Sequence, residues 1–220
     1  MSNSALLAHD RARGVRLIAG VDEVGCACLA GPIVAAGVLF DLERLLAGAG
    51  RGLLEEVRDS KRLGAAKRER LAQAVFTYAD SVSLVSIPAN EIDRVGLRAA
   101  HVACLERALR SAGARAELCL VDGELVLGPE VPAHELIVRG DGTSAAIAAA
   151  SIVAKVARDR FMVRLGERYP GYGFERHKGY PTKVHRAAVA KLGPTPAHRL
   201  SFKSSCFAEF AARSAGGAVS

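Results

Sequence analysis

The chain has 220 residues and a formal net charge of +7, and half of its residues are hydrophobic. This length fits one ordinary domain with at most a modest appendage, and it argues against two full domains. No apolar run reaches the ~18 residues that a membrane-spanning helix needs, and residues 1–14 lack the apolar core of a secretory signal. Five scattered cysteines, an odd number, suit a reducing compartment. We therefore expect a cytoplasmic protein that does not act at membranes.

The first ninety residues contain three short apolar runs and one helical pattern. Residues 17–21 and 33–40 are rich in β-branched and apolar side chains, which predicts two strands joined through a glycine-containing loop. Apolar residues at helical spacing predict a helix over residues 65–78. A third strand is predicted at residues 82–87, before Pro88.

A helical pattern follows over residues 91–112, as one helix or as two interrupted near Gly96. His101 lies on the apolar stripe of this segment, where we expect a core position. Short apolar runs at residues 118–121 and 136–138 predict two more strands.

The next predicted helix begins after Thr143 or Ser144, either of which can cap it, and runs to about residue 165. Its first half is small and apolar on every side, so it must be buried. Residues 166–182 are rich in Gly, Pro and Tyr and are expected to be irregular, and a short helix is predicted near residues 183–191.

No repeat or linker marks a second domain. Strands followed by alternating helices and strands predict an α/β layer fold with a mixed sheet. We expect a flexible N-terminus at residues 1–14, a single catalytic domain at 15–210 and a disordered tail at 211–220.

Basic residues concentrate toward the C-terminus. Residues 155–203 hold twelve Lys or Arg and three Asp or Glu, a net +9 that leaves −2 for the rest of the chain. Residues 161–210 hold eight of the eleven aromatic residues. Basic charge interleaved with rings suits a polyanion with stackable bases. A solvated basic face, with the aromatic rings turned into the core, fits the same composition equally well.

Four acidic residues follow predicted strands: Asp22, Glu23, Asp122 and Asp141. If these strands lie side by side in one sheet, the four carboxylates meet at one edge, where sites gather in such folds. Each acid taken alone is more simply a helix cap or a turn residue, and only their joint placement favours a site. Clustered oxygen ligands without a suitably spaced His or Cys pair favour Mg²⁺ or Mn²⁺. Two such ions about 3.5 to 4 Å apart can hydrolyse a phosphodiester.

Several segments together resemble the type 2 ribonuclease H (RNase HII) family, in the family's order and at family-like spacing. The match covers about residues 17–202 and includes GVDEVGCACLAGPIVAAGV (20–38), DSKRL (59–63), EID (91–93), VDG (121–123), GD (140–141), IAAASIVAKVARD (147–159), YGFERHKGYPT (172–182) and HRLSF (198–202).

The resemblance implies an RNase H-like α/β fold, a mixed five-stranded sheet flanked by helices, with a helical and irregular C-terminal extension that includes the basic, aromatic-rich residues 161–210. It implies an endoribonuclease that binds two Mg²⁺ or Mn²⁺ ions at the same four acids. It further implies cleavage of the RNA strand of RNA·DNA hybrids, and of DNA that contains ribonucleotides, to a 3′-hydroxyl and a 5′-phosphate. No obligate protein partner is implied.

The same resemblance implies three nucleic-acid contacts. Tyr180 corresponds to the family tyrosine that packs on the sugar next to the cut and detects an RNA–DNA junction. Lys61 and Lys178 are similar to family residues near the nucleic-acid backbone. Solvated surface lysines are the alternative for both.

One loop departs from the family pattern. After Asp-Glu the family usually carries Gly-Arg-Gly, which cradles the junction, whereas this chain has Gly25-Cys26-Ala27. An alanine in place of the second glycine is expected to be strained or to push the substrate strand away, and loss of the arginine removes a fixed positive charge. We expect retained metal binding and a weaker preference for a lone ribonucleotide within DNA. A non-catalytic or altered-specificity hybrid-binding protein is the alternative.

Overall fold

The computed structural model covers the whole chain and describes residues 3–48, 52, 56–57 and 64–216. The chain forms two compact units. The first comprises residues 1–24, 34–86 and 101–157, and the second comprises residues 25–33, 87–100 and 158–220.

A five-stranded mixed sheet of order β3-β2-β1-β4-β5 forms the centre of the first unit. Strand β1 pairs antiparallel with β2 and parallel with β4, which in turn pairs parallel with β5. The strands are β1 (Leu17–Val24), β2 (Ile33–Asp41), β3 (Ser81–Ile87), β4 (Leu118–Asp122) and β5 (His134–Ile137). All five predicted strands are present, but β1 continues past its predicted end at residue 21 to Val24, and β5 begins two residues before its predicted start.

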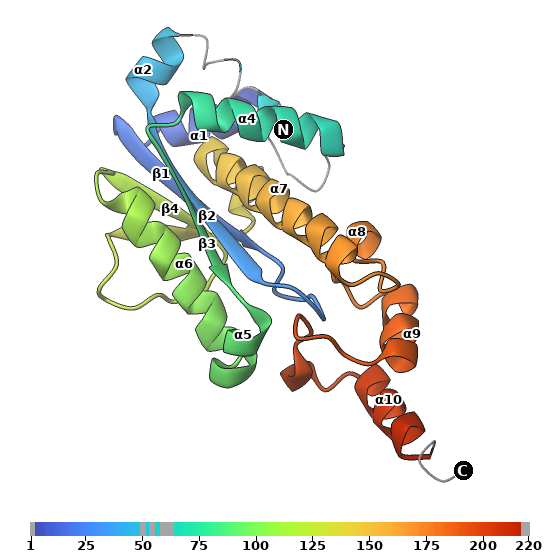
Figure 1. Cartoon of the computed structure of the whole chain (residues 1–220). Coiled ribbons are helices and arrows are strands. Elements are labelled where there is room, and N and C mark those ends of the chain that lie inside the picture. The colour runs from blue at the N-terminus through green and yellow to red at the C-terminus, as the bar shows by residue number, and fades with distance from the viewer. Residues whose placement is uncertain (1–2, 49–51, 53–55, 58–63, 217–220) are drawn as a thin grey trace. The chain divides into compact units, whose positions relative to one another are not determined.

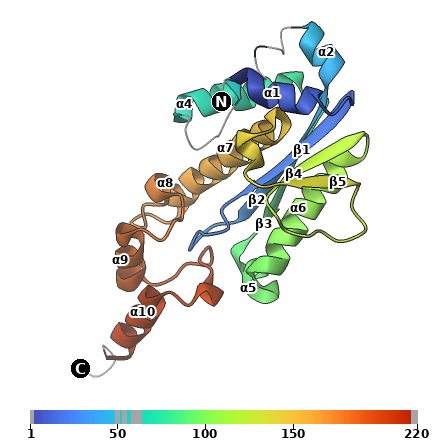
Figure 2. The same cartoon turned by 180° about the vertical axis from the view of Figure 1, so that it is seen from behind.

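Helices cover both faces of this sheet (Figures 1 and 2). Helices α4 and α7 lie on one face and α6 lies on the other. The helices of the described residues are α1 (Asn3–Arg11), α2 (Leu42–Ala47), α4 (Ala65–Tyr78), α5 (Ala89–Val95), α6 (Leu97–Gly113), α7 (Ala145–Arg168), α8 (Phe174–His177), α9 (Lys183–Leu192) and α10 (Ser205–Gly216), with 3₁₀ turns η2 (Gly140–Gly142) and η3 (Leu200–Phe202). The predicted interruption at Gly96 separates α5 from α6, because Gly96 adopts a positive φ of 85°.

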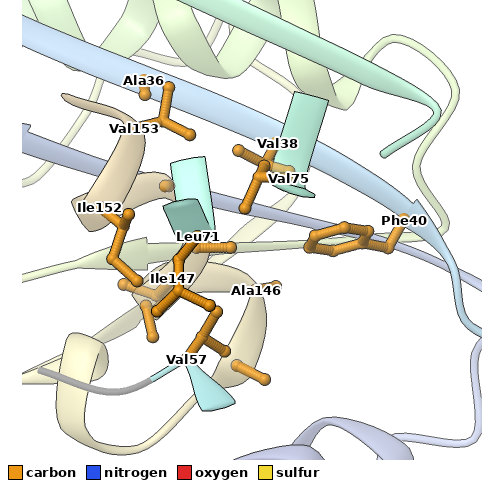
Figure 3. Packing of buried hydrophobic residues seen from close by; sticks show 14 of the residues in the cluster. Ala36, Val38, Phe40, Val57, Leu71, Val75, Ala146, Ile147, Ile152 and Val153 are labelled. Carbon is orange, nitrogen blue, oxygen red and sulfur yellow. The ribbon is translucent and has the colours of Figure 1, made fainter. Parts of the chain in front are cut away.

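The main core lies between the sheet and the helices α4 and α7. Figure 3 shows Val38 and Phe40 of β2 packed with Leu71 of α4 and Ile147 of α7. The first half of α7 is buried as predicted, since residues 145–150 are at most 1% exposed. A side chain at Gly20 would collide with the backbone of Ala146, so this glycine lets α7 approach β1 closely.

Helix α7 begins at two caps. The Ser144 hydroxyl accepts a hydrogen bond from the Ile147 amide at 3.2 Å, as predicted for a capping residue. The Asp10 carboxylate accepts one from the Ala146 amide at 2.9 Å. Asp10 belongs to α1, which forms within the segment that was predicted to be flexible and buries Leu6 and Leu7 in the core.

The second unit has its own small core around the C-terminal half of α7. Phe174, Tyr172 and Met162 are buried there against Leu29 and Val189.

Helix α10 continues to Gly216, within the tail that was predicted to be disordered. The division of the chain into domains remains a prediction. None of the helices in the described part of the chain is both long and apolar enough to cross a membrane.

Candidate active site

Two parallel neighbouring strands carry an aspartate at matching positions, Asp22 two residues before the end of β1 and Asp122 at the end of β4. Val21 of β1 lies opposite Val121 of β4, so Asp22 and Asp122 are the next residues on each strand. Strand β5 runs parallel to β4, and the chain that leaves it turns through η2, which carries Asp141. Three segments distant in sequence therefore reach the same end of the sheet, as their strand-end positions predict.

Asp22 is the most buried of the four acids, with 5% of its surface exposed. Burial raises its pKa well above the ordinary value, and the negative charges of Glu23 and Asp122 raise it further. Its carboxylate accepts hydrogen bonds from the Glu23 amide, at 2.7 Å, and from Ser151 of α7. The side chain is therefore held in one orientation on the α7 face of the sheet.

Asp122 is fixed in a similar way. Its carboxylate accepts a hydrogen bond from the Gly140 amide at 2.5 Å. Burial raises the pKa of Asp122, the Gly140 hydrogen bond lowers it, and the charges of Asp141 and Glu23 raise it. Asp141 is 8% exposed. The four predicted acids thus lie close enough to repel one another.

Glu23 has a neighbour that the sequence did not reveal. Its Oε1 atom lies 3.1 Å from Nε2 of His101, on α6. The His101 side chain is 20% exposed, so the prediction of an ordinary core histidine is wrong. The apolar stripe of a helix indicates which residues face inward. It does not indicate that α6 lies beside the end of β1, which brings His101 next to Glu23.

Gly25, Cys26 and Ala27 lie in the second unit, and buried arginines hold the segment that follows them. Arg158, with no exposed surface, donates to the carbonyls of Pro32 (2.9 Å), Lys178 (2.8 Å) and Ala30 (3.2 Å). Gly25 has a φ of 100°, and a side chain there would collide with the Arg158 guanidinium.

Arg199, equally buried, donates to the carbonyls of Gly31 and Cys26. The Gly179 carbonyl accepts a hydrogen bond from the Leu29 amide at 2.8 Å. The loop that replaces Gly-Arg-Gly is therefore tied to the turn that carries Lys178 and Tyr180.

Tyr180 is 40% exposed while its backbone is fixed. The Tyr180 carbonyl hydrogen-bonds to Nδ1 of His185 at 2.9 Å, and Nε2 of His185 lies 3.1 Å from Nε2 of His198. Burial lowers the pKa of both histidines to about 4. The Lys178 ammonium donates to the Glu175 carbonyl. Lys61 lies outside the described residues.

Comparison with known proteins decides the family. The family model described as Ribonuclease HII matches residues 19–205. The chain is similar to the ribonuclease HII of Ruegeria pomeroyi, with 50% identity over 194 residues, 87% of this chain and 78% of that protein. The chain belongs to the ribonuclease HII family. The predicted resemblance is confirmed, and it identifies a ribonuclease family that cleaves the RNA of RNA·DNA hybrids.

Solved structures of related proteins confirm the RNase H-like fold. The ribonuclease H2 of Pyrococcus horikoshii OT3 aligns with a TM-score of 0.73 at 23% identity, over 90% of this chain and 98% of that one. Bst-RNase HIII, in a crystal structure in complex with Mn²⁺, aligns with a TM-score of 0.68 at 20% identity, over 90% of this chain and 70% of that one.

The Gly25-Cys26-Ala27 loop, which replaces the Gly-Arg-Gly usual in the ribonuclease HII family, differs from the prediction in one respect. Among the described residues, non-glycine residues with positive φ are Arg139, Lys178 and Lys203. Ala27 therefore has an ordinary backbone conformation: of the two effects expected there, backbone strain is wrong, and displacement of the substrate strand stays a prediction. The arginine that the family usually carries is nevertheless replaced by Cys26, which is partly exposed.

Proposed function

We propose that the protein is a metal-dependent endoribonuclease that hydrolyses the RNA strand of RNA·DNA hybrids at Asp22, Glu23, Asp122 and Asp141, leaving a 3′-hydroxyl and a 5′-phosphate. The observation that carries the proposal is the crowding of carboxylates at the ends of β1 and β4. Burial and mutual repulsion raise the pKa of both Asp22 and Asp122, so a cation at this place would be strongly stabilised.

The donor set fits two Mg²⁺ or Mn²⁺ ions, because four carboxylates supply the hard oxygen ligands that these ions prefer. The Mn²⁺ complex of Bst-RNase HIII, which has the same fold, is consistent with this choice. When bound, such ions activate the attacking water and stabilise the leaving oxygen of the phosphodiester.

The chain's own contribution is to fix the carboxylates before substrate arrives. Asp22 is oriented by the Glu23 amide and Ser151, and Asp122 is oriented by the Gly140 amide. Ligands that are already positioned lose little freedom when the ions and the substrate bind.

Substrate contacts are proposed for the second unit. The half-exposed ring of Tyr180 would pack on the sugar beside the cut, and Lys178 would contact the backbone together with Gly25, Cys26 and Ala27. Lys61 is proposed as a further backbone contact. With Cys26 in place of the family's arginine, a lone ribonucleotide in DNA should be preferred less strongly than in relatives that carry it. The expected location is the cytoplasm, and cleavage should need no obligate protein partner.

A cleavage assay tests the proposal with three labelled duplexes: an RNA·DNA hybrid, DNA that contains one ribonucleotide, and plain DNA. Cutting of the hybrid that requires Mg²⁺ or Mn²⁺ is the expected result. Binding without cutting would favour the alternative, a non-catalytic hybrid-binding protein. Strong preference for the single ribonucleotide would contradict the proposed effect of Cys26, and so would unchanged selectivity after the paired change Cys26→Arg with Ala27→Gly.

A further inference from the structure

His101 presents a ring nitrogen that the described part of the chain leaves unsatisfied. Its Nε2 atom is buried and makes no hydrogen bond with any described residue, although it lies 3.1 Å from Oε1 of Glu23. The two atoms are close enough for a hydrogen bond, but they are not oriented so that one forms. A buried nitrogen in this state costs stability, so its position calls for a ligand.

The separation of these two atoms fits a pair of donors to one cation. Ligand atoms about 2.1 Å from an ion and adjacent in an octahedron are about 3.0 Å from each other. Donors that share an ion point toward the ion and not toward each other. This explains how Nε2 and Oε1 can be near neighbours without a hydrogen bond between them.

Because side chains alternate along β1, Glu23 and His101 lie on the opposite face of the sheet from Asp22. Successive residues of a strand point to opposite faces. Asp22 meets Ser151 of α7 on one face, and Glu23 meets His101 of α6 on the other. Part of the imidazole is exposed, although its Nε2 atom is buried.

We propose that Nε2 of His101 is a ligand of the divalent ion that Glu23 binds. The inference rests on the proposed function, because it adds a nitrogen donor to the proposed metal site. Imidazole favours transition metals over Mg²⁺. The Glu23 position should therefore hold Mn²⁺ more tightly than a site made only of carboxylates, and Mg²⁺ should gain much less.

Pulsed electron paramagnetic resonance of the Mn²⁺-loaded protein tests this directly. The intact chain should give the coupling of a directly bound ¹⁴N nucleus, and the signal should change to that of ¹⁵N when histidine is ¹⁵N-labelled. His101→Gln should abolish the coupling and weaken Mn²⁺ binding in calorimetry by roughly tenfold or more, while Mg²⁺ binding changes less. His134→Gln is the matched control, since His134 lies in the same unit with Nδ1 on the Pro132 carbonyl; it should change neither.

The outcomes separate this inference from the proposed function. Mn²⁺ that binds, and is lost in Asp122→Asn, without any nitrogen coupling in the unaltered chain would overturn the role of His101 and leave the carboxylate site standing. A coupling that persists in His101→Gln would also overturn it. Failure of the unaltered chain to bind Mn²⁺ while it binds Mg²⁺ would overturn only the role of His101, and failure to bind either ion would overturn both proposals.

Discussion

Two regions of this protein bury charge in opposite ways. At the ends of β1 and β4, Asp22 and Asp122 are crowded by other carboxylates, and burial together with this repulsion raises their pKa. In the second unit, Arg158 and Arg199 are fully buried, but backbone carbonyls accept the hydrogen bonds of their guanidinium groups. These two buried arginines are therefore satisfied by the chain itself, whereas Asp22 and Asp122 are left beside other negative charges.

We interpret the difference as one between charge that stabilises the fold and charge that takes part in the proposed function. A buried arginine with matched acceptors fixes loops, and removing it leaves several carbonyls without donors. A buried cluster of like charges is unfavourable for the fold alone, and such clusters are typical of sites that bind something of opposite charge. Substitutions and changes of pH in either region test this difference.

Asp122→Asn should have the largest effect. The amide oxygen can still accept the Gly140 hydrogen bond, but the negative charge that we propose binds metal is lost. Hybrid cleavage should therefore fall more than about 100-fold, beyond the usual cost of losing an outer-shell partner. Without divalent ions the variant should be at least as stable as the unaltered chain, because one repulsion is removed. Cleavage rates and thermal unfolding in EDTA measure both, with exposed Glu124→Gln as the control. A large loss of stability would show that the carboxylate is structural.

Arg158→Met should mainly affect the free energy of unfolding. The variant leaves the carbonyls of Pro32, Lys178 and Ala30 without their donor, at a cost of about 3 kcal/mol or more. Denaturant unfolding of this variant and of Arg164→Met, an exposed position on the same helix, gives the comparison. Equal stability of the two variants would mean that the three hydrogen bonds contribute nothing.

The gathering of the acidic residues was predictable, because the apolar runs that lead up to them can be read from the sequence. Apolar runs that stop at Asp22 and Asp122 indicate where the carboxylates lie. Parallel pairing of β1 with β4 then brings the two aspartates to matching positions. The fold class followed from the order of strands and helices in the same way.

Contacts between distant segments were not predictable. Helix α1 is polar and mixed in charge, and its Asp10 caps a helix whose Ala146 is 136 positions away. His101 was assigned to the core from its helical stripe, and nothing local indicates that it faces Glu23. The strain expected at Ala27 rested on residue type alone, and the backbone there is ordinary.

Acid should act on the two regions with opposite sign. Burial lowers the pKa of His185 and His198 to about 4 from 6.5, so the unfolded chain binds more protons than the folded chain between these values. Stability of the second unit should be complete above about pH 6.5 and should fall toward pH 4, by up to about 1.4 kcal/mol per pH unit for each histidine. Asp22 and Asp122 have a raised pKa, so their unfavourable contribution should shrink as the pH falls.

Region-resolved hydrogen exchange in EDTA at pH 5 and pH 7, corrected for intrinsic rates, measures these two trends. Segments around His185 and His198 should lose protection at pH 5, while segments around Asp22 and Asp122 should keep or gain it. Adding Mg²⁺ at pH 7 should protect the acidic segments and leave the histidine segments unchanged. Parallel loss in both regions at pH 5 would contradict the opposite signs.

Tyr180→Ala should give the smallest effect and the cleanest separation of binding from folding. The ring is 40% exposed, while the Tyr180 backbone is held by hydrogen bonds to His177 and His185 that the variant keeps. The free energy of unfolding should therefore change by less than about 0.5 kcal/mol. Loss of ring packing on the substrate should raise KM for the hybrid roughly fivefold to tenfold, in line with about 1 kcal/mol or more for an aromatic contact. Tyr180→Phe, which keeps the ring, should bind like the unaltered chain. A stability loss in Tyr180→Ala without a change in KM would assign the ring to the fold and remove it from the proposed substrate contacts.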